Sequence, residues 1–311
     1  MYFLISLRDY NAGGQPGPSI GQTTYIEIDD LEATYKQNNQ VKLDQWLNDL
    51  SSTGATNVLV FIHGFANDAM DIVTRHRLIK SHLPPGVCLV SFDWPSGNPG
   101  LTPEEKYTKD KANAAAIVLR LFRDCLSDKV LFSKFAQSNV HLFAHSLGAY
   151  VTEQAFLSTS TNDAFKVGHV LMAAADVDRL NYLRGSVSLQ NFMIKCSDLT
   201  AYWSQDDEAL KSSVLAKINN GAVPLGLRGF SDPEIPDGCK AVEGTAYYER
   251  YAINALPPGM NADEYSHVWY LFYQPQAPLV NDFYSDLTEV LTGSSTSPTR
   301  TQTSYERLRK A

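Results

Sequence analysis

The clearest pattern along the chain is a series of short, continuous apolar runs, each followed by a segment with helical spacing. Runs of this length, rich in β-branched residues, predict strands that are covered on both faces. They lie at residues 58–62, 87–92, 140–144 and 167–174. Helical spacing follows the first three runs, at residues 68–81, 107–125 and 147–157. This alternation predicts an α/β fold with a mostly parallel sheet wrapped by helices.

The segments on either side extend the same pattern. Near the start, strands are expected at residues 2–7 and 23–28, with a helix at 42–50. The Gly- and Pro-rich stretch 12–18 between the two strands predicts a loop. After the fourth run the expected order is helix, strand, helix, loop and strand, at residues 189–196, 199–203, 207–217, 223–238 and 240–247.

The last stretch of the chain differs in composition from the rest. Residues 292–303 are rich in Ser and Thr and carry too little apolar surface to fold. We therefore expect a single domain over residues 1–291 and a low-complexity, unstructured tail over 292–311.

Polar residues follow several of the predicted strands directly. His63, Asp93, Ser146 and Asp176 each come just after an apolar run. Because ligands of parallel sheets bind at the carboxyl ends of the strands, these side chains are expected along one edge. That edge is the predicted location of a functional site.

Ser146 has the sequence context of a nucleophile. It lies in Ala144-His145-Ser146-Leu147-Gly148, between a predicted strand and a predicted helix. A serine at such a corner is held on a tight, strained turn that exposes its hydroxyl, and small neighbours let the strand and the helix approach. Alanine replaces the first glycine of the usual Gly-x-Ser-x-Gly pattern, which weakens this steric argument but does not remove it.

A serine hydroxyl needs a base, and the base needs an orienting carboxylate. Of seven histidines, only His267 follows both a candidate acid and a late predicted strand, which gives the chain order Ser…Asp…His. The alternative is that its ring only packs under the aromatic run 268–273.

Three aspartates are candidates for the acid. Asp207 is favoured because it lies at a predicted helix start, where backbone amides can hold it ionised and fixed. Its neighbour Asp206 and the post-strand Asp176 remain alternatives.

An oxyanion formed in acyl transfer needs two amide donors. We expect the N–H groups of Leu147, directly after the nucleophile, and of Phe65, in the loop after the first buried strand. His63, His145, Trp94 and Tyr107 are expected to line or support the pocket, although structural packing explains them equally well.

Composition narrows the choice of partners. The net charge of −8 argues against nucleic acid, because phosphate binding needs a basic face. No apolar run reaches the ~18 residues of a membrane span. The four cysteines show no metal-ligand spacing, and we expect free thiols, no metal and no cofactor. Free thiols and the lack of a signal-like start favour a cytoplasmic protein.

Taken together, these motifs resemble one bacterial branch of the α/β-hydrolase superfamily, domain of unknown function family nine hundred. The resemblance rests on residues 61–65, 91–96, 144–148, 173–178, 204–210, 225–229 and 266–267, together with Tyr107 and Asp110. It implies an α/β-hydrolase fold, with about eight strands in a mostly parallel sheet and helices on both faces. It also implies Ser146 as nucleophile, Asp207 as acid and His267 as base.

The expected function is that of a carboxylesterase acting on a small-molecule ester with a short-to-medium acyl chain. Lipase, acyltransferase and amidase activities use the same three residues and remain alternatives, as does a non-catalytic binding module. No long amphipathic insertion that would form a lid lies between Ser146 and Asp207. Residues 219–263 are expected to overhang the pocket.

Overall fold

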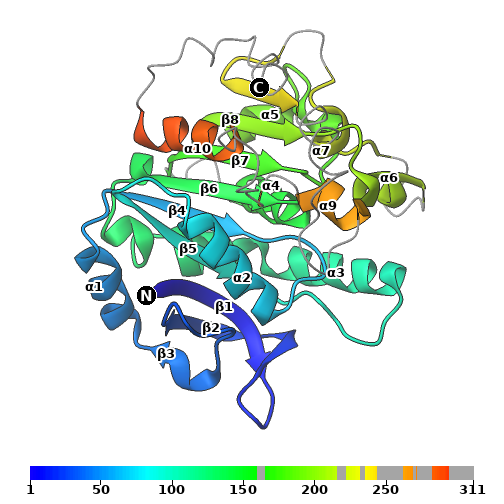
Figure 1. The fold of residues 1–311 in the computed structure, drawn as a ribbon. Helices are drawn as coiled ribbons and strands as arrows, with labels where there is room; N and C mark the ends of the chain where they lie inside the picture. The colour runs from blue at the N-terminus through cyan, green and yellow to red at the C-terminus, as the bar shows by residue number, and fades with distance from the viewer. Residues whose placement is uncertain are drawn as a thin grey trace.

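The computed structural model describes residues 1–159, 165–215, 222–231, 235–243, 262–268, 271 and 282–293. A nine-stranded sheet forms its centre (Figure 1). The strand order is β3-β2-β1-β5-β4-β6-β7-β8-β9. The strands are β1 (Tyr2–Tyr10), β2 (Pro16–Ile28), β3 (Gln40–Val41), β4 (Asn57–Ile62), β5 (Val87–Asp93), β6 (Val140–His145), β7 (Val167–Ala173), β8 (Cys196–Trp203) and β9 (Cys239–Glu243).

The sheet is parallel from β1 to β9, and only the β1–β2 and β2–β3 pairs are antiparallel. This confirms the predicted α/β fold with a mostly parallel sheet. The one strand that was not predicted is β3. Its two residues are too few to show the alternation of apolar and polar residues that marks a strand. Parallel strands leave one carboxyl edge, at which the turns after β4, β5, β6, β7 and β8 meet.

Helices cover both faces of the sheet. Their bounds are α1 (Leu43–Ser52), α2 (Ala69–Lys80), α3 (Pro103–Leu121), α4 (Leu147–Ser158), α5 (Val187–Met193), α6 (Glu208–Leu215), α7 (Leu225–Arg228), α9 (Ala262–Val268) and α10 (Asp282–Thr292). Side chains of α1, α3, α4 and α5 pack into one hydrophobic core. Side chains of α2, α6, α9 and α10 pack on the opposite face of the sheet.

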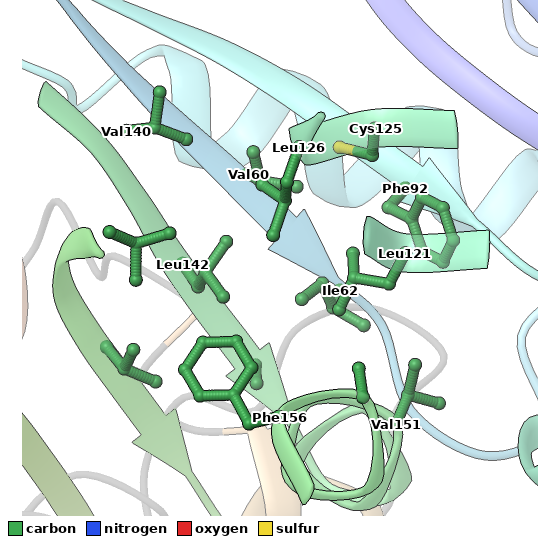
Figure 2. Packing of buried hydrophobic residues seen from close by; sticks show 14 of the residues in the cluster. Val60, Ile62, Phe92, Leu121, Cys125, Leu126, Val140, Leu142, Val151 and Phe156 are labelled. Atoms are coloured by element: carbon green, nitrogen blue, oxygen red, sulfur yellow. The ribbon is translucent and has the colours of Figure 1, made fainter. Parts of the chain in front are cut away.

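The central strand β4 shows why its sequence is continuously apolar. Val58, Val60 and Ile62 point into the first core, and Leu59 and Phe61 point into the second. Figure 2 shows Val60 and Ile62 in the first core, with Leu142 of β6 and Val151 and Phe156 of α4. Full burial of one such side chain contributes about 1.5–3 kcal/mol. Both faces of the strand therefore need apolar residues.

One loop prediction was wrong at its end. Residues 16–18 belong to β2, where Pro16 pairs with Tyr10 of β1. Prolines fit here because this part of β2 is an edge: β3 pairs only with Tyr25 and Ile26. The true turn is confined to residues 11–15.

Boundaries after β7 also differ from the predictions. The predicted helix 189–196 is α5, which ends at Met193, and Cys196 already pairs with Val167 of β7. The predicted loop 223–238 contains α7. The predicted strand 240–247 is described only to Glu243, as β9. Three predicted segments lie largely outside the described residues: 219–263, which was expected to overhang the pocket, the aromatic run 268–273 and the tail 292–311.

Candidate active site

Ser146 occupies the turn between β6 and α4. Its backbone has φ 54° and ψ −123°, a conformation that a side-chain-bearing residue rarely adopts. Its N–H donates to the Ala173 carbonyl at 3.0 Å, and its own carbonyl accepts from the Asp176 N–H at 3.1 Å. These bonds to the end of β7 and the turn after it hold the strained turn in place.

Two glycines make room for this turn. A Cβ atom on Gly148 would lie 2.2 Å from the Ile62 carbonyl oxygen, so only glycine lets α4 approach β4 this closely. A Cβ atom on Gly64 would lie 2.6 Å from the Cβ of Ser146. Gly148 thus lets the helix and the strand come close, as its sequence context predicts. Gly64 does the same for the loop after β4 and the Ser146 turn.

Positive φ angles gather around Ser146. Among non-glycine residues of the described chain they occur only at Ala66, Ser146 and Ala174, which follow β4, β6 and β7. All three turns lie at the carboxyl edge of the sheet. The backbone strain of the described chain is thus concentrated at this edge.

Asp207 and His267 form a hydrogen-bonded pair. His267 Nδ1 lies 2.8 Å from Asp207 Oδ2. The other carboxylate oxygen accepts the Leu210 N–H at 2.9 Å, in the first turn of α6. Asp207 is 1% exposed, so both bonds are shielded from water. A carboxylate can only accept, which places the proton of a neutral His267 on Nδ1 and leaves Nε2 basic.

The other two candidate acids have different partners. Asp206 lies 3.7 Å from Lys211 Nζ. Asp176 accepts a hydrogen bond from the Tyr107 hydroxyl at 2.6 Å. Of the three aspartates, Asp207 is the one that the structure pairs with His267.

His267 follows the last described strand, β9, in the chain, but it is carried by a helix that the sequence analysis did not predict. It lies near the end of the short helix α9. Figure 1 shows α9 beside α6, and the Glu208 N–H of α6 donates to Ser266 Oγ at 3.0 Å. Contacts between α6 and α9 therefore bring the histidine to the edge of the sheet.

A cavity of about 330 Å³ opens at this edge. Ser146 is only 4% exposed, but it lines the cavity together with His267. The remaining lining residues are Phe65, Arg75, Pro103, Glu104, Tyr107, His145, Asp176, Ala209, Leu210 and Ser212. The cavity thus brings the serine and the histidine together with the expected Phe65, Tyr107 and His145.

The backbone amides of Leu147 and Phe65 are the two that the sequence analysis expected to bind an oxyanion. Leu147 N–H is the first amide of α4, where no intrahelical acceptor exists. Within the described part of the chain, neither this amide nor that of Phe65 has a hydrogen-bond acceptor. Both remain available to a bound molecule.

The loop that carries Phe65 is held by polar contacts. The Asp110 carboxylate accepts from the N–H groups of Ala66 and Gly97, at 3.1 and 3.2 Å. The side-chain amide of Asn67 donates to the carbonyls of Gly64 and Phe65, at 3.0 and 2.6 Å. Asp110 of α3 and Asn67 of the loop itself therefore hold the loop in place.

Of the four residues expected to line or support the pocket, His145 and Tyr107 line the cavity, whereas His63 and Trp94 do not. Both side chains are fully buried and neither lines the cavity. Their rings stack with centroids 5.0 Å apart, and the indole N–H donates to the His63 carbonyl at 2.9 Å. These contacts stabilise the loop after β4.

Arg75 of α2 is a lining residue that the sequence analysis missed. Its guanidinium lies 3.3 Å from His145 Nδ1. The two residues lie 70 positions apart, and the burial period of α2 marks Ile72, Val73, His76 and Ile79 rather than Arg75. No local pattern therefore points to this contact.

A second, smaller cavity shares Asp176 with the first. It measures about 160 Å³ and has a polar wall that includes Lys111, Glu153, Asp178 and Asn181. Glu153 is buried and accepts from Asn181 Nδ2 at 3.2 Å. Burial raises the pKa of Glu153 above its ordinary value.

Neither a metal-binding cluster nor a membrane-spanning helix is found among the described residues. The described residues contain no group of three or more His, Cys, Asp or Glu side chains that could hold a metal ion. All four cysteines are unpaired. Within those same segments, every helix is too short or too polar to cross a membrane.

The solved structures to which the chain is similar share little sequence with it. Its fold resembles that of EstE7, an HSL homologue from a metagenome library, with 11% identity, 94% of this chain and 85% of that chain covered, and a TM-score of 0.41. A hyperthermophilic esterase from the archaeon Pyrobaculum calidifontis shares 12% identity over 77% of this chain and 76% of its own, with a TM-score of 0.38. The B. subtilis ydeN gene product shares 15% identity over 65% and 94%, with a TM-score of 0.32.

A comparison with curated proteins gives no match. A family model described as alpha/beta hydrolase of unknown function (DUF900) matches residues 39–231. That span contains Ser146 and Asp207 and ends before His267. The chain therefore belongs to the DUF900 family of α/β hydrolases.

Proposed function

We propose that the protein hydrolyses carboxylic esters through an acyl intermediate on Ser146. The observation that carries this proposal is the strained Ser146 in one cavity with His267, whose Nδ1 lies 2.8 Å from Asp207. A strained nucleophile, a base and an orienting carboxylate are the three parts that serine acyl transfer requires.

In the proposed first step, Ser146 Oγ attacks the ester carbonyl carbon and His267 Nε2 takes the hydroxyl proton. The amides of Phe65 and Leu147 would bind the oxyanion of the tetrahedral intermediate. When the intermediate collapses, the bond between carbon and the alcohol oxygen breaks. His267 gives its proton to the leaving alcohol, and Ser146 keeps the acyl group.

In the proposed second step, water takes the place of the alcohol. His267 removes a proton from the water as it attacks the acyl carbon, and then returns that proton to Ser146 Oγ. Asp207 stays ionised and stabilises the imidazolium that forms in each step. Every bond and proton in the two steps is accounted for without an atom from a metal or cofactor.

The cavity supports small substrates. Its volume of about 330 Å³ is near the lower end of ligand pockets, which span roughly 300–1,000 Å³. Phe65, Pro103 and Leu210 supply apolar wall. We therefore propose short-to-medium acyl chains, and expect p-nitrophenyl acetate and butyrate to be turned over faster than the palmitate ester.

The direct test is Ser146→Ala. We expect kcat for a p-nitrophenyl ester to fall at least about 10⁴-fold, because the nucleophile is lost while binding remains. A fluorophosphonate probe should label the wild type and leave the variant unlabelled. The melting temperature should not fall, since the change removes only a hydroxyl from a turn held by backbone bonds.

Ser19→Ala is the matched control, because Ser19 is exposed on β2, outside the cavity lining. Its activity and labelling should equal those of the wild type. Turnover by Ser146→Ala within tenfold of the wild type would end the proposal. Faster acyl transfer to an added alcohol or amine than to water would instead assign the protein as an acyltransferase.

A further inference from the structure

His145, next to Ser146 in the chain, makes contacts that point to a role in the proposed reaction. It is the last residue of β6, it is 2% exposed, and it lines the cavity. Its ring centroid lies 4.8 Å from that of His267, at an angle of 49°. The inference below rests on the proposed function of Ser146 and His267.

The two ring nitrogens of His145 face groups of opposite kinds. Nδ1 lies 3.3 Å from an Arg75 guanidinium nitrogen, which can only donate. Nε2 lies 3.3 Å from the backbone carbonyl oxygen of His267, which can only accept. Both contacts are satisfied by one neutral tautomer, with the proton on Nε2. Arg75 thereby selects the form of His145 that can donate to His267.

The surroundings keep this ring neutral. Burial, the neighbouring His267 ring and the Arg75 guanidinium together lower the pKa of His145 well below its usual value. A charged His145 would carry a proton on Nδ1 as well and would repel Arg75. The donor and acceptor roles of the two nitrogens therefore stay fixed at neutral pH.

The carbonyl that His145 contacts belongs to the last turn of α9. The last four carbonyls of a helix have no intrahelical donor, so His267 C=O needs an outside partner. Two further hydrogen bonds link α9 to the site, from Glu208 N–H to Ser266 Oγ and between His267 and Asp207, and Tyr265 and Val268 of α9 are buried in the second core. A helix of seven residues has little stability of its own and depends on such contacts.

We propose that His145 is a positioning residue for the base, and that Arg75 fixes the tautomer in which it acts. Asp207 holds the imidazole of His267, and His145 holds its backbone. The base is then held at two points, one on its side chain and one on its backbone. Without the second point, the ring can swing about the Asp207 contact and lose its alignment with Ser146.

Two substitutions at position 145 separate this role from simple packing. His145→Phe keeps a ring of similar size but removes both polar atoms. His145→Gln can donate to the His267 carbonyl through its amide nitrogen and accept from Arg75 through its amide oxygen. For His145→Phe we expect kcat to fall about 10²-fold with KM changed by less than about threefold, because a misplacement near 1 Å has that effect on a catalytic group. His145→Gln should recover at least about tenfold of this loss.

Several outcomes would overturn the proposal. If His145→Phe keeps the wild-type kcat, or if His145→Gln is no better than His145→Phe at equal folded fraction, the donor role is wrong. Ser146→Ala, measured in the same assay, shows separately whether the proposed hydrolysis stands. An inactive Ser146→Ala with a fully active His145→Phe would remove only the positioning role.

A third variant keeps the test decisive if His145→Phe does not fold. Arg75→Met leaves the buried ring in place and removes the guanidinium that donates to it. We expect kcat to fall about tenfold as His145 loses its fixed tautomer. The rate of fluorophosphonate labelling of Ser146 should fall in parallel, since labelling also needs the base. Unchanged kcat and labelling in both Arg75→Met and His145→Gln would overturn the proposal.

Discussion

Two carboxylates at the same edge of the sheet have very different surroundings. Asp93 ends β5 and Asp207 follows β8. The Asp93 carboxylate accepts from Arg8 Nε at 2.8 and 3.0 Å and from the Tyr35 hydroxyl, and it has no exposed surface. Asp207 instead pairs with His267, which lines a cavity. A carboxylate after a strand therefore marks a structural ion pair as readily as a candidate site.

A second pair of residues repeats the contrast. His76 Nδ1 lies 2.8 Å from Ser91 Oγ, so the chain contains a buried serine–histidine pair besides Ser146 and His267. Both partners are almost completely buried, and His76 Nε2 has no hydrogen-bond partner among the described residues. What distinguishes the candidate site is access to a cavity, not the residue types.

The Arg8–Asp93 pair also shapes the site from a distance. Arg8 donates to the backbone carbonyls of Asn67 and Ser96, at 2.8 and 2.9 Å. These residues lie on the loops after β4 and β5. Burial opposes the ionised form of Asp93, but the Arg8 guanidinium, His63 and the Tyr35 hydroxyl together outweigh it and lower the pKa of Asp93 below its ordinary value. The first strand of the chain thus holds the loop that carries Phe65.

The largest expected effect comes from Asp207→Asn. The amide would favour the wrong tautomer of His267 and remove the charge that stabilises its imidazolium. We expect kcat to fall about 10⁴-fold with a stability change below about 1 kcal/mol. Steady-state kinetics and urea unfolding measure the two quantities.

Asp206→Asn is the matched control for this prediction. Asp206 is the adjacent carboxylate and lies near Lys211 rather than His267. Its kcat should stay near that of the wild type. If Asp206→Asn loses more activity than Asp207→Asn, the assignment of the acid is wrong.

The next effect concerns stability rather than turnover. Asp93→Asn leaves the buried Arg8 guanidinium without its counter-charge. We expect the free energy of unfolding to fall by about 3–5 kcal/mol, as when one partner of a buried ion pair is removed. Asp30→Asn breaks exposed contacts with the N-terminus and Lys80, and should change it by less than about 1 kcal/mol. If both substitutions change the free energy of unfolding equally in urea, the buried Arg8–Asp93 pair is no more important to stability than the exposed contacts of Asp30.

The smallest effect is a pH dependence of stability. Burial lowers the pKa of His76 to about 3 from 6.5, so the unfolded chain binds the proton more readily. The stabilising contribution of neutral His76 is complete above pH 6.5 and is lost as the pH falls below it. Between pH 7 and pH 5 the loss amounts to about 2 kcal/mol. His76→Gln should flatten the curve of unfolding free energy against pH by this amount, and an unchanged slope would refute the prediction.

The comparison also explains which parts of the fold could be predicted from the sequence. Strands β4 and β6 were predicted almost to the residue, because both faces are buried and the apolar run has no gap. The start of β2 was missed, since its prolines and glycines are typical of loops and only the edge position tolerates them. The helical location of His267 was missed because it depends on contacts between α6 and α9.

The candidate site, like the fold, could be predicted from the sequence only in part. Chain order and positions after predicted strands singled out Ser146 and His267 and favoured Asp207, with Asp206 and Asp176 left as alternatives. The contact from Arg75 to His145 joins α2 to β6 and leaves no trace in local spacing. For His63 and Trp94 the sequence could not separate lining the pocket from structural packing, because residues directly after strands look alike whether they face a cavity or the core.

The three left-handed turns at Ala66, Ser146 and Ala174 have a consequence for engineering the protein. Each such conformation costs of order 1–3 kcal/mol, and glycine would relieve it. Glycine at positions 66 and 174 would remove that cost but would also free two turns next to the Phe65 amide and to Asp176. Substitutions that raise heat resistance at these positions would therefore lower the turnover rate. Stabilising substitutions are better made far from this edge of the sheet.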